Sequence, residues 1–528
     1  AAANPDSVAC IDGAGEMSYA ELDLRSTRLA QEILAASPVR KGRIAVATDR
    51  SRAMLVTLLG VMKAGHAYVP LDVRQPRERL QQIADAAGID GIVCQDEWVQ
   101  SVAGKAVVVR LDRLDPGRAR PTPLPDLPAV SSSDSAYILF TSGSTGAPKG
   151  VEVSHRALTN VISCVAGVCD VTSADRAVAS SAVTFDVAAM ELYAPLISGG
   201  RVIVADREQV VSGVELVALA GKEGATLMQA TPTLWRMLLE AGFRSHPGLK
   251  MITAGEALPR DLADRLLAGG GRLWNLYGPT ETAIYSSGGE VHAGEGGITI
   301  GRPLANTQLF VLDDRDTILP PGVAGNLVIG GDGLARSYVG RADLTAQAFP
   351  QIAVVGRAPQ RLYRTGDLAR LLPSGEFELL GRGDRQVKLR GFRIELEEIE
   401  AVLRRASGVR DCAVLLRDDA GTDPSLVAYV VTDGAAESAD LAAHLAGRLP
   451  DYMVPVHWIE LAALPLTSSG KLDRNALPTP SHALADAGEP VAERPRTALE
   501  TAIADVWASV IGRASIGIDS PLFSLGAD

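Results

Sequence analysis

Residues 136–150 read AYILFTSGSTGAPKG, a strand and loop pattern typical of α/β proteins. The apolar run predicts a buried strand, and the pattern from His155 onward predicts a helix. Between them, glycines, hydroxyl side chains and Lys149 provide close backbone approach, hydrogen-bond donors and a cation, which a phosphate group needs. Because Ala147 and Pro148 separate the lysine from the preceding glycine, the loop is not a Walker P-loop. Composition alone is equally compatible with a flexible surface loop.

The sequence on both sides of this loop predicts a large α/β domain over residues 1–383. From about residue 17 to 112, helix patterns alternate with short runs such as RIAVAT and GIVCQ, and RLYRTGDLARLLPSGEFELLGRGD predicts the hairpins that close the domain. A small α+β domain is predicted over 384–477, followed by a Pro- and Ala-rich linker over 478–495. The amphipathic helix that follows, within 496–528, has an apolar face that a partner surface is expected to cover.

Bulk composition excludes several classes of protein. The 51 basic and 63 acidic side chains give a net charge of -12, which disfavours nonspecific binding to nucleic acid or acidic membranes. No apolar run approaches the roughly 18 residues of a membrane helix. The five cysteines are scattered without the spacing of a zinc site or a disulfide scaffold, so a cytoplasmic location is expected. The opening lacks the features of a signal peptide and is interpreted as a start partway into a longer polypeptide.

The loop and ten further stretches, in their order along the chain, resemble the core motifs of the amino-acid adenylation domains of nonribosomal peptide synthetases, members of the adenylate-forming superfamily. Besides the loop at 141–150, the matching stretches are MSYAEL (17–22), VMKAGHAYVPLD (61–72), FDVAAMEL (185–192), ITAGEAL (252–258), NLYGPTE (275–281), GNLVIGGDGLARSY (325–338), YRTGDL (363–368), GRGDRQVKLRGFRIELEEIE (381–400), LPDYMVP (449–455) and SSGKLDR (468–474). Asn326 replaces the usual acidic residue and Ser469 the usual Asn, and neither change removes a catalytic group. The resemblance implies a layered α/β large domain with a β-barrel-like subdomain and a small α+β C-terminal domain.

The resemblance also implies ATP-dependent activation of a carboxylic acid as its acyl-adenylate, with Mg²⁺ as cofactor. Lys471 is the expected catalytic cation on the substrate carboxylate and α-phosphate, Glu281 the expected Mg²⁺ ligand and Thr280 a donor to phosphate. Asp384 matches the family's hinge. The nucleotide-binding residues implied are Thr141, Ser142, Gly143, Ser144, Thr145, Lys149, Gly255, Glu256, Asn275, Tyr277, Asp367 and Arg382. On sequence alone, Tyr277 could equally be core packing and Asp367 a turn residue.

Asp186 matches the family's aspartate that pairs with the α-amino group of the substrate, which favours an amino acid over fatty or aryl acids. The other positions implied for the pocket carry no charge and include several bulky side chains; they are Val187, Met190, Gln229, Ile252, Ala254, Leu276, Ile284 and Tyr285. We therefore expect a small neutral amino acid, with glycine ranked first and proline or alanine next.

The final residues, IGIDSPLFSLGAD, resemble the entry to a peptidyl carrier domain but stop before the serine that receives phosphopantetheine. A carrier protein domain and neighbouring synthetase modules are the expected partners, and an MbtH-like protein is a further possible one. Two other interpretations remain open at this stage: a standalone acyl or aryl acid–CoA ligase, which shares the fold and chemistry, and a non-catalytic scaffold module. Asp186 and the carrier-like tail disfavour the first, and the presence of Lys149, Glu281 and the other catalytic positions disfavours the second.

Overall fold

The chain divides into two compact units, and neither is built from one continuous stretch of sequence. One contains residues 1–141 and 148–393, and the other contains residues 142–147 and 394–528. The computed structural model describes residues 1–36, 39–95, 107–111, 126–143, 147–353, 358–417, 424–434, 437–466, 472–479, 495–511 and 516–518.

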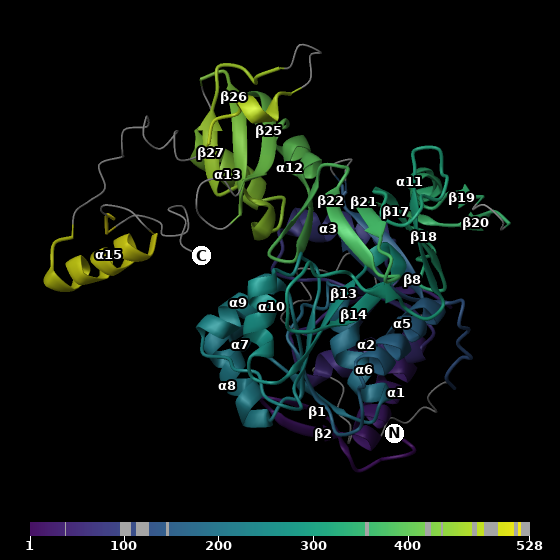
Figure 1. Cartoon of the computed structure of the whole chain (residues 1–528). Helices are drawn as coiled ribbons and strands as arrows, with labels where there is room; N and C mark the ends of the chain where they lie inside the picture. Colours follow the sequence, from purple (N-terminus) through teal and green to yellow (C-terminus); the bar gives the residue numbers. More distant parts are fainter. Residues whose placement is uncertain are drawn as a thin grey trace. The chain divides into compact units, whose positions relative to one another are not determined.

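The first unit contains a seven-stranded sheet whose centre is parallel. The middle strands are fully buried runs rich in Ala, Val and Ile, as expected for a parallel sheet covered on both faces. Across the sheet the strands are β18 (Ser337–Tyr338), β8 (Lys149–Ser154), β7 (Ser135–Thr141), β4 (Ala67–Pro70), β3 (Arg43–Ala47), β5 (Gly91–Cys94) and β6 (Val107–Arg110). The associated helices are α1 (Tyr19–Ala36), α2 (Arg52–Lys63), α3 (Arg77–Ala87) and α5 (His155–Val168). In Figure 1, α1, α2 and α5 lie together with α6 (Val187–Ile197), a helix of the next sheet, and α1 packs against α2.

A second, nine-stranded sheet of the same unit carries most of the predicted substrate positions. Its strands are β15 (Arg302–Pro303), β14 (Ser287–Val291), β13 (Arg272–Tyr277), β12 (Lys250–Thr253), β11 (Leu227–Ala230), β9 (Arg176–Ala179), β10 (Arg201–Val204), β1 (Val8–Asp12) and β2 (Gly15–Ser18). The strands from β13 to β1 run parallel, and antiparallel strands lie at both edges. Its helices are α6 (Val187–Ile197), α7 (Arg207–Val211), α8 (Gly213–Glu223), α9 (Pro232–Glu240) and α10 (Arg260–Leu267).

Local sequence explains where helix α9 begins. Thr231 precedes it, and its hydroxyl accepts the backbone N–H of Leu234 at 3.2 Å, while Pro232 occupies the first turn, where its missing N–H costs nothing. The helix then buries Trp235, whose indole nitrogen donates to the carbonyl of Ile252 at 3.2 Å. This bond ties the helix to strand β12 at one of the predicted pocket positions.

A four-stranded antiparallel sheet completes the large unit. Its strands are, in order, β16 (Thr307–Leu312), β17 (Gly325–Gly331), β21 (Tyr363–Leu371) and β22 (Phe377–Arg382). Smaller elements accompany it: α11 (Ala342–Ala348), the pair β19 (Gln351–Ile352) and β20 (Gln360–Arg361), and the hairpin of β23 (Gln386–Leu389) and β24 (Phe392–Glu395). The hairpins predicted from RLYRTGDLARLLPSGEFELLGRGD are thus present as β21 and β22.

The second unit has a three-stranded sheet of β25 (Val409–Arg417), β26 (Ser425–Thr432) and β27 (His457–Glu460), with helices α12 (Leu396–Leu403) and α13 (Ser438–Ala446). The sequence pattern predicts helix from Ile394, but Ile394 and Glu395 extend strand β24 and the helix begins at Leu396. Helix α15 (Ala498–Ile511) exposes Leu499, Ile503 and Val506 of its predicted apolar face.

These elements confirm the predicted fold class, a large unit of mixed α/β sheets and a small α+β unit. The contact boundary falls between Arg393 and Ile394, ten residues beyond the predicted boundary at 383/384, and the predicted domain limits stay predictions. Residues 480–494 of the predicted linker lie outside the described residues. Within the described part of the chain, no helix combines the length and apolarity needed to cross a membrane.

Candidate functional site

The predicted phosphate loop joins two antiparallel strands. Strand β7 ends at Thr141 and β8 begins at Lys149, and these two residues face each other in register. The sequence predicted strand, loop and helix; strand β8 intervenes before the helix, which begins at His155. Ser144 and Thr145 lie outside the described residues. Ser142 and Gly143 group with the second unit, where the Ser142 hydroxyl accepts the N–H of Glu395 at 3.2 Å and the Gly143 N–H donates to Glu398 at 2.9 Å.

Glu281 lies in a single turn, Thr280–Thr282, that follows strand β13, and it is completely buried. Tyr338 donates its hydroxyl to Oε1 at 2.7 Å, and Nζ of Lys149 lies 3.6 Å from the same oxygen. Arg393 donates to Oε2 at 2.5 Å. The turn is also held through its backbone, because the N–H of Ala335 donates to the Glu281 carbonyl at 2.8 Å. Two strands, a turn and a hairpin therefore meet at one carboxylate.

These neighbours keep Glu281 ionised. Burial alone would raise its pKa, but the positive charges of Arg393 and Lys149, with the hydrogen bonds from Tyr338 and Arg393, lower it to about 2. An ionised carboxylate is the form that coordinates Mg²⁺. The described residues contain no group of three or more His, Cys, Asp and Glu side chains placed to hold a metal ion.

Asp367 is held from two sides. It lies on β21 directly opposite Arg382 on β22, and Arg382 donates to its Oδ1 at 2.9 Å. The hydroxyl of Tyr277 donates to Oδ2. Arg382 also donates to both carboxylate oxygens of Asp384, the predicted hinge residue, at 2.7 and 2.6 Å. Nζ of Lys388 lies 5.7 Å from the centre of the Tyr277 ring, so the ring already has a cation over one face.

Asp186 immediately precedes helix α6 and is almost fully buried. Burial raises the pKa of its carboxyl, while a hydrogen bond from the Thr280 side chain and one from the backbone of Val187 lower it in part. Because Thr280 neighbours Glu281, the predicted amine-binding carboxylate and the predicted metal ligand meet at one turn. The negative charge of Glu281 further raises the pKa of Asp186.

The structure gathers the predicted pocket residues. Gln229, Ile252 and Leu276 lie on the neighbouring strands β11, β12 and β13, and Gln229 faces Ile252 in register. Tyr285 donates its hydroxyl to Oε1 of Gln229 at 2.7 Å. The apolar members belong to one buried cluster, against which Val187 packs; they are Met190, Ile252, Ala254, Leu276, Ile284 and Tyr285. Ile284 has a φ of 68°, which is rare for a β-branched residue and marks a strained turn.

Three further residues predicted to bind the nucleotide, Asn275, Glu256 and Gly255, have local contacts or a backbone conformation that the structure defines. The side chain of Asn275 donates to the carbonyl of Thr299 at 2.8 Å. The carboxylate of Glu256 accepts the hydroxyl and the backbone N–H of Thr233, at 2.8 and 3.1 Å. Gly255 has a φ of 89°, a conformation that favours glycine. Lys471, the predicted catalytic lysine, lies outside the described residues.

Sequence reasoning missed three charged or polar residues of this site: Tyr338, Lys388 and Arg393. All three lie inside quoted motifs, Tyr338 at the end of GNLVIGGDGLARSY and the other two in GRGDRQVKLRGFRIELEEIE. A buried ionised carboxylate requires nearby cations. The prediction that Glu281 binds a metal therefore also implies that basic or hydroxyl side chains in these motifs contact it.

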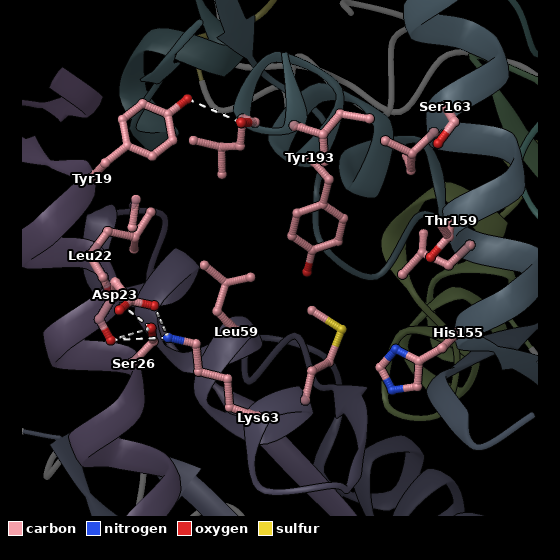
Figure 2. Close-up of a pocket in the computed structure, with 16 residues that line it drawn as sticks. Tyr19, Leu22, Asp23, Ser26, Leu59, Lys63, His155, Thr159, Ser163 and Tyr193 are labelled. Carbon is pink, nitrogen blue, oxygen red and sulfur yellow. Dashed lines mark hydrogen bonds and ion pairs between the residues drawn. The ribbon is translucent and has the colours of Figure 1, made fainter. Parts of the chain in front are cut away.

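A separate cavity of about 390 Å³ lies among helices α1, α2, α5 and α6. Figure 2 shows its mixed lining, with Leu22, Leu59 and Tyr193 around the space and Lys63 turned toward Asp23, to which it donates at 2.6 Å. None of the predicted site residues lines this cavity.

Comparisons with known proteins agree with this geometry. Residues 1–339 match the family of AMP-binding enzymes, and residues 398–471 match the AMP-binding enzyme C-terminal domain. The dimodular nonribosomal peptide synthase of Bacillus subtilis (strain 168) is 39% identical over 99% of this chain, and gramicidin S synthase 2 of Brevibacillus brevis is 36% identical over 99%. The chain spans only 22% and 12% of these two proteins.

Solved structures give the same result. A four-domain nonribosomal peptide synthetase bound to AMP and glycine is 35% identical, with a TM-score of 0.67 over 99% of this chain and 38% of that one. A protein with adenylation and carrier domains, bound to a vinylsulfonamide inhibitor, is 27% identical, with a TM-score of 0.81 over 99% of this chain and 89% of that one. The predicted resemblance to the adenylation domains of nonribosomal peptide synthetases is confirmed, and the predicted start of a carrier domain stays a prediction. The chain therefore belongs to the family of AMP-binding enzymes and is similar, over nearly its whole length, to a part of several nonribosomal peptide synthetases.

Proposed function

We propose that this chain joins a small neutral amino acid to AMP, using ATP and Mg²⁺ and releasing pyrophosphate. The observation that carries the proposal is the buried turn at which Thr280 contacts Asp186 and Glu281 meets Lys149 and Arg393. Beside Thr280, the carboxylate of Asp186 can pair with an amine. Beside Glu281, that carboxylate can bind a metal, and the cations Lys149 and Arg393 can bind phosphates. An amino acid bound with its amine at Asp186 thus has its carboxylate directed to the phosphate-binding side.

The nucleotide is proposed to bind along the edge formed by Tyr277 and Asp367. An aspartate held by Arg382 and Tyr277 is an immobilised acceptor for two ribose hydroxyls. Tyr277 offers a ring face to adenine, and Gly255 allows the base to approach the backbone. The loop around Thr141, together with Lys149, is proposed to receive the phosphates. The remaining predicted nucleotide contacts are Ser142, Gly143, Ser144, Thr145, Glu256 and Asn275.

Glu281 fits the role of a Mg²⁺ ligand because its environment keeps it ionised and it presents two oxygens. Bound Mg²⁺ would neutralise charge on the phosphates. Lys149 and Arg393 hold the same carboxylate, and both can instead donate to phosphate when a nucleotide arrives. Lys471 is proposed as the catalytic cation that follows the negative charge developing between the substrate carboxylate and the α-phosphate.

The amino acid is proposed to be small and neutral, with glycine first and proline or alanine next. Asp186 is the one charged residue among the predicted pocket positions, so a charged substrate side chain would have no counter-ion there. Met190, Leu276 and Tyr285 are buried and fill space, which leaves little room for a large side chain. Glycine is bound in a solved relative at 35% identity, which supports this ranking.

The aminoacyl group of the adenylate is proposed to pass to the phosphopantetheine thiol of a carrier domain. Asp384 is proposed as the hinge at which the chain changes between an adenylating and a thiol-transfer arrangement. Relatives several times longer than this chain, and one solved relative with a carrier domain, support a place beside other modules. An MbtH-like protein remains a candidate partner, and secondary-metabolite synthesis in the cytoplasm is the proposed setting. The scattered spacing of the five cysteines is compatible with that compartment.

The test is ATP–pyrophosphate exchange by the purified chain against a panel of amino acids. Glycine, proline or alanine should support the fastest exchange, and strong activation of an acidic, basic or large aromatic amino acid would defeat the pocket assignment. Lys471→Ala should lose adenylation by at least about a hundredfold, as for other groups that stabilise transition-state charge. Full exchange by that variant would remove Lys471 from the mechanism.

A further inference from the structure

The loop of residues 180–186 connects strand β9 to helix α6 and ends in Asp186. It contains a turn in which the N–H of Phe185 donates to the carbonyl of Ala182 at 2.9 Å. The edge of the Phe185 ring contacts Phe392, with ring centres 5.0 Å apart. Since Asp186 lies directly after this turn, its position depends on how the start of the loop is held.

Arg50 holds the carbonyl groups at the start of this loop. It follows strand β3 of the seven-stranded sheet, 129 residues earlier in the sequence than the first carbonyl it reaches. Its guanidinium donates to the carbonyls of Ala179 and Ser181 at 2.8 and 2.5 Å, and to the carbonyl of Ala205, after β10, at 2.8 Å. One planar side chain thus connects the ends of two parallel strands with the other sheet.

Glu191 holds the N–H groups of the same segment. It lies one turn inside helix α6 and is 2% exposed. Its Oε2 accepts the backbone N–H groups of Ser180 and Ser181 at 2.9 and 2.8 Å, and its Oε1 accepts the Ser181 hydroxyl at 2.7 Å. Asp186 stands five positions earlier in the chain, so Glu191 ties its own helix to the segment that delivers this aspartate.

We propose that Arg50 and Glu191 are positioning residues for Asp186 and thereby for the amino group of the substrate. This inference rests on the proposed function, because it assumes that Asp186 pairs with that amine. The two side chains hold opposite polar edges of residues 179–181, where the chain passes from the last residue of strand β9 into the loop. These bonds end on the backbone of residues 179–181 and on the Ser181 hydroxyl, so the proposed effect on substrate passes through the loop.

Variants of Arg50 and Glu191 should weaken binding of the amino acid and leave binding of ATP unchanged. Losing a hydrogen bond to a charged group weakens an interaction by about tenfold to a hundredfold. If Asp186 moves, the KM for the amino acid should therefore rise by at least about tenfold for Glu191→Ala and for Arg50→Met. The KM for ATP should change by less than about twofold, because the predicted nucleotide residues lie on other elements. Glu191→Gln keeps an acceptor for the two N–H groups and should restore most of the amino-acid affinity.

Asp175 provides a matched control at the other end of strand β9. It is buried like Glu191, accepts the N–H of Thr172 at 2.7 Å and the hydroxyl of Thr226 at 2.8 Å, and pairs with Lys250. Asp175→Asn should lower stability without a selective rise in the amino-acid KM. Ser181→Ala removes only one hydroxyl and serves as a milder variant if Glu191→Ala fails to fold; it should raise the amino-acid KM severalfold.

The readouts are both kinetic constants from pyrophosphate exchange, the melting temperature, and amino-acid binding by calorimetry without ATP. A selective rise in amino-acid KM, matched by weaker binding, supports the proposal. It is overturned if the amino-acid and ATP constants rise equally, if only the melting temperature falls, or if Asp175→Asn gives the same selective rise. If wild-type protein shows no amino-acid-dependent exchange, the proposed function fails; if Asp186→Asn leaves the amino-acid KM unchanged, its amine role fails, independently of this result.

Discussion

Tyr338 donates its hydroxyl to Oε1 of Glu281 at 2.7 Å, and this bond joins two residues that lie 57 positions apart in the chain, in different motifs. The acceptor is a fully buried carboxylate that also meets Lys149 and Arg393. Buried charges of this kind are tolerated only when each oxygen has a donor or a cation. The side chains around Glu281 therefore determine whether it stays ionised and aimed at a metal.

Tyr338→Phe removes the only hydroxyl that the described residues direct at Glu281 Oε1. Hydrogen bonds to charged groups contribute about 1.5–3 kcal/mol, so the free energy of unfolding should fall by about 2 kcal/mol. The half-saturating Mg²⁺ concentration for exchange should rise severalfold. Tyr285→Phe is the control, because its hydroxyl donates to the neutral amide of Gln229 and should leave the Mg²⁺ dependence unchanged. An unaltered Mg²⁺ dependence in Tyr338→Phe would separate this tyrosine from the metal site.

The lowered pKa of Glu281 predicts a stability that declines in acid. Its folded-state pKa is about 2 and its ordinary value is 4.5, so the stabilisation is fully present above about pH 4.5 and is lost as the pH falls toward 2. The amount is roughly 3 kcal/mol. Urea unfolding between pH 5 and 2.5 should show a shallower pH dependence for Glu281→Gln than for wild type. The exposed Glu208→Gln should keep the wild-type slope, and equal slopes in all three proteins would contradict the assignment.

Glu191 should show the opposite dependence. Burial raises its pKa from 4.5 to about 7, although the hydrogen bonds from Ser181 and the charge of Arg50 lower it in part. The folded state therefore binds the proton more tightly than the unfolded state, and this group's contribution to stability falls as the pH rises from about 4.5 to 7. Relative to Glu191→Gln, wild type should lose roughly 3 kcal/mol across that window. Calorimetric unfolding at several pH values measures this, and a constant difference would refute it.

Asp367→Asn should weaken nucleotide binding selectively. The variant loses the charge that Arg382 and Tyr277 hold in place and, under the proposed function, one acceptor for a ribose hydroxyl. The KM for ATP should rise by about tenfold or more, with the amino-acid KM changed by less than about twofold. Asp313→Asn, in an exposed turn where the carboxylate accepts N–H groups of Arg315 and Thr317, is the control and should bind ATP normally. A normal ATP KM in Asp367→Asn would remove the ribose assignment.

The sequence patterns predict the family and several of the buried parallel strands. Parallel strands such as β3 and β5 appear as short apolar runs, and the order of motifs around Lys149 identifies the chemistry. Local patterns depend only on neighbouring residues. They therefore predict loop where strand β8 is present, and they predict that helix α12 begins at Ile394, two residues before its observed start at Leu396. These differences arise because sheet pairing overrides local preference at element ends.

The contacts that organise the site depend on long separations in sequence. Arg393 reaches Glu281 across 112 residues, and Arg50 reaches the loop before Asp186 across more than 100. Nothing in the periodicity of either segment indicates such pairing. The positive φ of Ile284 could not be predicted from the sequence either, because β-branched residues rarely adopt that conformation. These features follow from packing of the folded unit and require coordinates.

Under the proposed function, Asp186 recognises an amine, so that an amino acid, and not a plain carboxylic acid, is the substrate. The most direct measurement is ATP–pyrophosphate exchange with glycine and with acetate, for wild type and Asp186→Asn. In wild type, exchange with glycine should be at least about a hundredfold faster than exchange with acetate, and Asp186→Asn should lose most of that preference. Equal use of glycine and acetate by wild type, or an unchanged preference in the variant, would contradict this role of Asp186.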